Sequence, residues 1–206
     1  TGGGFSFSRP LNGGDPFKVA KWRVLAGMNI KKVKMIDSSG NKKPYGDLTP
    51  TKGNISEIIC IGFTPNDGSC PAENTLVSFI ASTTRNNLNN SVNPTSGNKF
   101  SFGSEQFVSM GENSPTFNRI RASYSYFIPT KLINLTKECR SSNSTSEDCP
   151  QAIGFQLKAG TIVGDLPPYE AFCMGGTSSV RGWGSCDLAV SKSFVEGTAE
   201  YRFPLW

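Results

Sequence analysis

Residues 153–162 read Ile-Gly-Phe-Gln-Leu-Lys-Ala-Gly-Thr-Ile, with apolar and polar side chains in alternation. One face of an extended chain would carry Ile153, Phe155, Leu157, Ala159 and Thr161. The other would carry Gly154, Gln156, Lys158, Gly160 and Ile162. A period of two is typical of a β-strand whose two faces meet different environments. The stretch therefore predicts a strand with an apolar face and a face that includes a full charge.

The same alternation recurs along the chain and predicts about eight strands, with no helix of normal length. They are expected near residues 3–8, 22–35, 55–63, 76–86, 98–108, 117–128, 151–164 and 192–203. Several of these segments are long enough for a tilted membrane strand of about 9–11 residues, whereas strands of soluble proteins usually have about 5–6. Turn sequences such as Pro-Asn-Asp-Gly at 65–68 separate them.

The composition also indicates a membrane barrel. Hydrophobic residues make up 36% and charged residues 18% of the 206 residues, both below the roughly 45–50% and 25% of soluble domains. A sheet with one lipid face and one neutral polar face has this composition. The sequence thus predicts an all-β, antiparallel, up-and-down transmembrane barrel. Alternation alone leaves a β-sandwich open as the alternative.

Aromatic residues gather near two strand ends that precede Pro129 and Pro204. They are Tyr124, Tyr126, Phe127, Tyr201 and Phe203. An aromatic girdle at the lipid interface would place aromatic side chains there. An ordinary aromatic core is the alternative.

Several kinds of chemistry have no support in the sequence. The chain has no histidine, so a serine hydrolase triad lacks its usual base. No repeated Cys-x-x-Cys pattern indicates zinc, and Gly2–Gly4 lacks the Lys-Ser/Thr pair of a phosphate-binding loop. The net charge is +5 without a basic run, which argues against nucleic-acid binding. We expect no enzyme, no cofactor and no metal site.

Cysteines give a separate prediction. They are Cys60, Cys70, Cys139, Cys149, Cys173 and Cys186, and six cysteines allow fifteen pairings. Pairing of sequence neighbours would close three connections between strands. Disulfides indicate an oxidising compartment; unpaired buried thiols are the alternative.

The stretch that bears on function is residues 164–183, Gly-Asp-Leu-Pro-Pro-Tyr-Glu-Ala-Phe-Cys-Met-Gly-Gly-Thr-Ser-Ser-Val-Arg-Gly-Trp. It resembles the long sixth extracellular loop of the BamA-type outer-membrane barrels, in which Gly-Gly and a short spacer precede Val-Arg-Gly-aromatic. Residues 85–97, 121–129 and 199–205 resemble further segments of that family. The sequence of residues 165–172 is most similar to the cyanobacterial and chloroplast branch of that family.

The resemblance implies a sixteen-stranded barrel preceded by soluble POTRA domains. This chain would then run from about the fifth to the twelfth strand, so residues 1–206 form one partial barrel domain. The POTRA domains and the first and last strands would be absent. The expected location is the outer membrane of a Gram-negative or cyanobacterial cell, with the chloroplast outer envelope as the alternative.

The resemblance also implies roles for the loop residues. Gly175, Gly176 and Gly182 would allow tight turns, and Val180 and Trp183 would hold the tip by apolar packing. Arg181 would present its guanidinium to the lumen, where it needs partners. Possible lumen partners are Glu196, Glu200 and Arg202.

The function implied is outer-membrane protein assembly, with client strands templated at a barrel seam by β-augmentation and the loop bracing the lumen. Expected partners are the lipid bilayer, unfolded outer-membrane or translocated polypeptides, and accessory assembly proteins. A polypeptide translocation channel of the chloroplast import or two-partner secretion type is one alternative. A passive porin and a soluble β-sandwich adhesin are the others.

Overall fold

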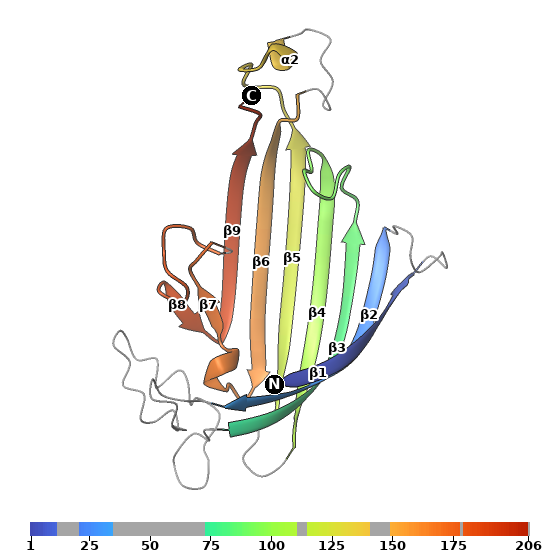
Figure 1. The fold of residues 1–206 in the computed structure, drawn as a ribbon, viewed down its shortest axis with the longest axis vertical. Helices are drawn as coiled ribbons and strands as arrows, with labels where there is room; N and C mark the ends of the chain where they lie inside the picture. Colours follow the sequence, from blue (N-terminus) through green and yellow to red (C-terminus); the bar gives the residue numbers. More distant parts are fainter. Residues whose placement is uncertain (12–20, 35–72, 111–114, 141–148, 178, 206) are drawn as a thin grey trace.

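Most of the described chain is one curled antiparallel sheet. The computed structural model describes residues 1–11, 21–34, 73–110, 115–140, 149–177 and 179–205. The sheet has seven strands in the order β1-β2-β3-β4-β5-β6-β9. They are β1 Gly2–Pro10, β2 Trp22–Lys34, β3 Glu73–Asn86, β4 Gly97–Ser109, β5 Phe117–Pro129, β6 Ala152–Gly164 and β9 Ser193–Arg202. Figure 1 shows β1 crossing in front of the upright strands, as in part of a barrel wall. The predicted all-β partial barrel is confirmed.

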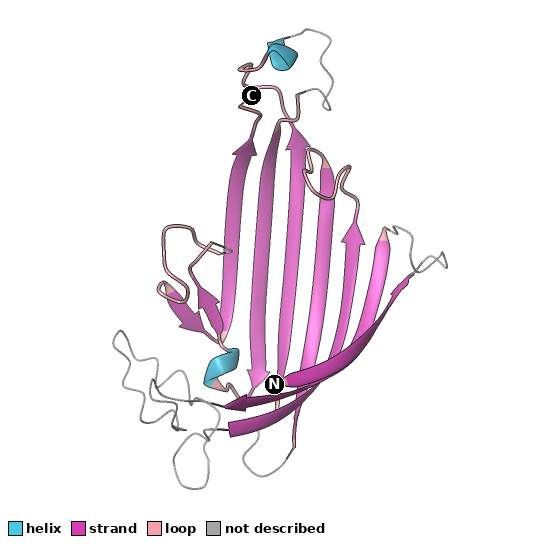
Figure 2. Cartoon of the chain, viewed as in Figure 1, coloured by secondary structure: helices cyan, strands magenta, loops and turns pink. Residues whose placement is uncertain are grey.

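The remaining elements are short and belong to two connections (Figure 2). Helix α2 (Lys137–Arg140) lies between β5 and β6. The connection from β6 to β9 contains a 3-10 turn, η2 (Pro168–Glu170), and a hairpin of β7 (Phe172–Met174) and β8 (Ala189–Ser191). Three-residue strands are too short for a period to predict them. Within the described ranges, no helix has the length and apolarity to cross a membrane.

One predicted strand, 55–63, lies outside the described residues. In the described sheet, β2 pairs directly with β3, from Trp22 opposite Arg85 to Lys34 opposite Glu73. Within the described residues the sheet therefore has seven strands, and the predicted strand 55–63 stays a prediction.

The two faces of the sheet differ as the alternation predicts. Phe7, Phe155, Leu157 and Val195 are exposed on the outer face, at 74%, 45%, 52% and 71% of their full areas. In the part of the chain that the structure describes, the second sheet is only the β7–β8 hairpin, and this hairpin belongs to the connection that folds onto the opposite, inner face. The outer face is thus an uncovered apolar surface, which a soluble sandwich would bury and a membrane barrel turns to lipid.

A small apolar core lies on the inner face, at the end where β6 stops. Leu76, Phe107, Phe117, Ile162 and Leu166 form it, and each is essentially fully buried. The rings of Phe107 and Phe117 stack with centroids 4.2 Å apart. Burial of each such side chain contributes about 1.5–3 kcal/mol. Because Leu166 comes from the connection after β6, this core attaches that connection to the wall.

The aromatic girdle needs one correction. Phe127 is buried at 8% exposure and faces inward, where Arg202 lies over its ring at 5.0 Å. Tyr124 and Tyr126 are on the opposite, outer face and are 42% and 41% exposed. Adjacent strand residues point to opposite faces, so Phe127 could not share the outer face with Tyr126.

Candidate functional site

The candidate site is the connection between β6 and β9, residues 165–192, which folds back onto the inner face of the sheet. Its first residue is fixed to the neighbouring connection by two hydrogen bonds. The Asp165 amide donates to the Thr116 carbonyl at 3.1 Å, and the Thr116 amide donates to Asp165 Oδ2 at 2.9 Å. Leu166 follows and enters the apolar core. The chain is therefore directed inward immediately after β6 ends.

Glu170 at the end of η2 is bound to charged side chains of the wall. Its side chain is only 5% exposed, and its two carboxylate oxygens accept from Lys31 of β2 and Arg119 of β5. Arg119 also pairs with Glu105 of β4 at 2.6 Å, and Ser78 of β3 donates to Glu105 at 2.8 Å. The result is a buried polar network that connects the loop to four strands.

Aromatic rings support this network. Lys31 Nζ and the Arg119 guanidinium lie 5.1 and 5.2 Å from the centre of the Phe107 ring, a range in which cation–π attraction operates. The Tyr169 hydroxyl donates to Asn74 Oδ1 at 2.7 Å. The root of the loop, which we define as residues 165–172, is thus held by apolar, ionic and polar contacts together.

A disulfide closes the middle of the loop. Cys173 in β7 pairs with Cys186, and their Cα atoms are 4.5 Å apart. Cross-linking a loop of this length removes chain entropy worth about 3 kcal/mol from the unfolded state. A second disulfide, Cys139–Cys149, closes the connection between β5 and β6, at the other end of the wall. Cys60 and Cys70 lie outside the described residues.

Two glycines shape the turn into the tip of the loop. Gly175 has φ +119° and Gly176 has φ +85°, a backbone region that side chains rarely adopt. A Cβ on Gly175 would also collide with the carbonyl oxygen of Gly184. The Gly176 amide donates to the Trp183 carbonyl at 2.9 Å, so the two ends of the tip lie side by side.

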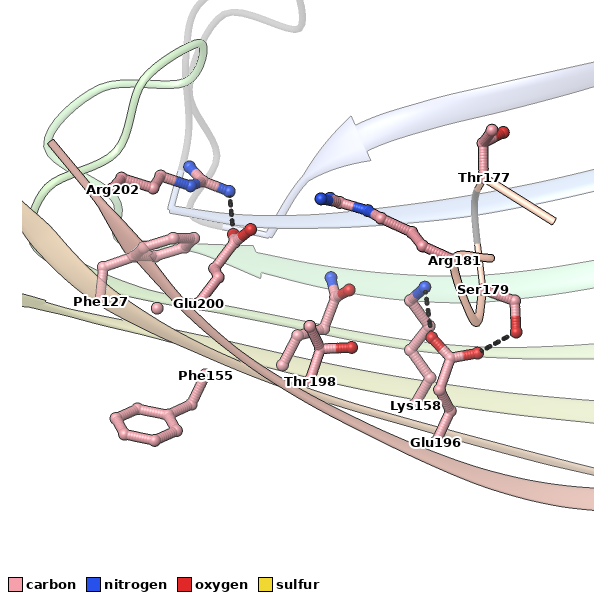
Figure 3. A pocket seen from close by; sticks show the side chains of 12 residues that line it. Phe127, Phe155, Lys158, Thr177, Ser179, Arg181, Glu196, Thr198, Glu200 and Arg202 are labelled. Carbon is pink, nitrogen blue, oxygen red and sulfur yellow. Dashed lines mark hydrogen bonds and ion pairs between the residues drawn. The ribbon is translucent and has the colours of Figure 1, made fainter. Parts of the chain in front are cut away.

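The tip, residues 177–183, contacts the wall through Glu196. Ser179 Oγ donates to Glu196 Oε2 at 2.7 Å, and Lys158 Nζ bonds Glu196 Oε1 at 3.1 Å. The Glu196 side chain is 8% exposed. Figure 3 shows both bonds on the inner side of the sheet, with Phe155 on the other side. Glu196 therefore serves as a joint between β6, β9 and the loop.

Arg181 points along the inner wall above Thr198 (Figure 3). It lines a cavity of about 190 Å³ together with Glu196, Glu200 and Arg202. Within the described residues, neither glutamate bonds it: Glu196 is bound to Lys158 and Ser179, and Glu200 is paired with Arg202. The same cavity thus contains Arg181 and the three predicted lumen residues, and Arg181 is exposed.

The expected apolar anchoring of the tip is not observed at Trp183, which is 53% exposed. The inner face beside the tip carries mostly polar side chains, such as Lys158, Glu196 and Glu200, so a ring finds little apolar surface there. Apolar anchoring occurs instead at the root, where Leu166 is buried and Phe172 packs against Phe194 at 4.8 Å. The alternation at residues 153–162 already predicted that Gln156 and Lys158 share one face of the strand.

Sequence reasoning missed Glu170, Arg119 and Glu105 as members of the site. Arg119 belongs to the predicted strand 117–128, but no pattern in the sequence linked it to Glu170, which is 51 residues later. The available signal was the position of Glu170, a carboxylate that directly precedes the apolar pair Ala171-Phe172 and follows two adjacent prolines.

Comparisons with known proteins agree with this architecture. The profile of the Omp85 superfamily domain matches residues 1–206. The protein named "Protein TOC75-4, chloroplastic" of Arabidopsis thaliana is 32% identical over 109 residues, which are 53% of this chain and 26% of that protein. "Protein TOC75, chloroplastic" of Oryza sativa subsp. japonica is 32% identical over 109 residues, 53% of this chain and 12% of that protein. "Outer envelope protein 80, chloroplastic" of Arabidopsis thaliana is 41% identical over 56 residues, 27% of this chain and 8% of that protein.

The matched part of this chain spans about a quarter of the first of these relatives and less of the other two. Their names agree with the predicted cyanobacterial and chloroplast branch. The curled sheet with an apolar outer face and an inward loop is the architecture that the resemblance implies. Because the family profile covers the whole sequence, this chain belongs to the Omp85 superfamily.

Proposed function

We propose that this chain is part of the barrel of an outer-membrane assembly protein, which inserts client β-barrels into the membrane. The observation that supports this proposal is the loop between β6 and β9, which is folded onto the inner wall and fixed at both its root and its tip. A loop held in this way restricts the lumen and stiffens one side of the barrel.

The proposed mechanism is strand templating at the barrel seam, without covalent chemistry. Inside the hydrocarbon region, every unpaired backbone N–H and C=O is costly, so an opened seam favours addition of a client strand. Arg181, which lines the lumen cavity without a bond to Glu196 or Glu200, would bind a carboxylate there as the seam opens. The strands that Glu170 and Glu196 connect to the loop would then move together.

The test is client folding by the full-length protein reconstituted in liposomes. Arg181→Ala is expected to slow the folding of an eight-stranded client barrel several-fold. The folding rate is measured on unheated gels, where folded barrels migrate faster than unfolded ones. Lys137→Ala is the matched control, since it removes one exposed cation from α2 at the other end of the wall. A client folding rate that Arg181→Ala leaves unchanged would contradict the proposal.

The second candidate is polypeptide translocation through the lumen, favoured by the charged inner face. Lys158, Glu196, Glu200 and Arg202 all line the cavity beside the tip, and a wet charged surface suits a moving polypeptide better than an apolar one. Protease protection separates the two functions: an inserted client stays in the membrane, whereas a translocated client becomes protected inside the liposome. A passive porin would instead give a large, constant conductance without any client.

A further inference from the structure

We propose that Glu170 is the positioning residue of the loop, and that its carboxylate determines where the Arg181 tip lies in the lumen. This inference rests on the proposed function only where it concerns client insertion, because the position of the tip can be measured without a client. The observations that carry it are the partners of Glu170 and the places where the loop contacts the wall.

Among the described contacts of the loop, those of Glu170 extend from one side of the sheet towards the other. Lys31 belongs to β2 and Arg119 to β5, and these strands are separated in the sheet by β3 and β4. One carboxylate therefore links two strands that have no direct contact through the ladder. Each of its oxygens has its own cation, so the group is fixed in orientation as well as in place.

Burial makes these contacts selective. The Glu170 side chain is 5% and the Arg119 side chain 14% exposed, so water is a poor substitute partner for either. A buried charge that loses its partner is strongly unfavourable, and a displaced root would leave Glu170 without Lys31 and Arg119. The ionic contacts thus favour one seating of the root, whereas apolar packing of Leu166 and Tyr169 tolerates small displacements.

The β7–β8 hairpin connects the root of the loop to the tip, so the position of the root limits the position of the tip. The β7–β8 hairpin follows η2 directly, and the Cys173–Cys186 disulfide closes it. The tip then contacts the wall at a different place, Glu196 of β9. The loop is consequently attached to β2 and β5 through Glu170 and to β9 through Ser179, with a disulfide-closed hairpin between these contacts. Loss of the contacts at the root is therefore expected to make the tip more mobile.

The experiment is a spin label at the exposed tip residue Thr177, introduced as Thr177→Cys in the full-length protein in liposomes. The protein without this substitution serves as the blank for labelling elsewhere. Glu170→Gln is expected to raise the fraction of the mobile spectral component several-fold. Lys31→Met, which leaves Arg119 in place, is expected to give a smaller increase.

Glu105→Gln is the matched control, because Glu105 belongs to the same buried network but does not touch the loop. If Glu170 positions the tip, this variant keeps the wild-type spectrum although it also weakens the network. If Glu170 only stabilises the barrel, Glu170→Gln and Glu105→Gln change the spectrum equally, or neither changes it, and the inference is wrong.

Lys31→Met also covers the case in which Glu170→Gln does not fold. In that case an increased mobile fraction in Lys31→Met, with none in Glu105→Gln, supports the inference, and equal spectra overturn it. Loss of client insertion alone, with the tip unmoved, would contradict the positioning role and leave the proposed function standing.

Discussion

At the scale of single residues, backbone conformation decides what the loop can carry. Gly175 adopts φ +119° and lies against the Gly184 carbonyl, so this position excludes a side chain for two reasons. Gly197 of β9 is different, because an added Cβ meets nothing within 4 Å and its φ is not positive. The two glycines therefore form a matched pair for substitution.

Gly175→Ala is expected to lower the free energy of unfolding by about 1–3 kcal/mol, the usual cost of a strained backbone. Gly197→Ala should stay within about 0.5 kcal/mol of the wild type, as surface substitutions do. Urea unfolding of the barrel in detergent or lipid measures both. Equal midpoints for the two variants would show that the turn at position 175 accepts an alanine without strain.

Residue scale also marks the limit of prediction from sequence. Arg181 could be assigned to the lumen because a recognisable motif surrounds it, and the structure places it in the inner cavity. Glu170 could not be assigned, because its partners Lys31 and Arg119 are distant in sequence and only the register of β2 to β5 brings them together. Trp183 was expected to pack against apolar side chains but is 53% exposed, because the sequence does not show which part of the sheet the tip contacts.

At the scale of elements, the alternation along each strand is the strongest predictor. It gave the faces of β6 correctly, with Leu157 exposed outside and Gln156 bonded inside to Ser125 of β5 at 3.2 Å. It failed for β7 and β8, which are too short to show a period.

Leu157→Arg and Gln156→Arg test these faces at adjacent positions. An arginine on the lipid face costs about 2–4 kcal/mol near the bilayer midplane, so Leu157→Arg should lower the stability of the lipid-embedded barrel by that amount. Gln156→Arg should cost far less, because its side chain enters water beside Ser125. The measurement is denaturant unfolding in liposomes, and equal losses for both variants would contradict the assignment of the faces.

At the scale of the whole molecule, the fold is a curved sheet whose outer face suits lipid and whose inner face suits water. In the described residues the sheet has seven strands, an apolar outer surface that no described element covers, and an inner surface that carries buried ion pairs and a folded loop. The two described disulfides close connections at opposite ends of this wall. Composition and alternation predicted the lipid face and the polar face, because few charges and many strands of membrane length are typical of a membrane barrel, and the family resemblance predicted the inward loop. The seating of the loop required the coordinates.

The most direct test of the account is the accessibility of four consecutive positions of β6 in the reconstituted full-length protein. Spin labels at Phe155, Gln156, Leu157 and Lys158 are compared for collisions with oxygen, which concentrates in lipid, and with a water-soluble nickel chelate. The account predicts oxygen access at Phe155 and Leu157 and nickel access at Gln156 and Lys158. Equal access to both reagents at all four positions, or the reversed pattern, would contradict a wall with lipid outside and water inside.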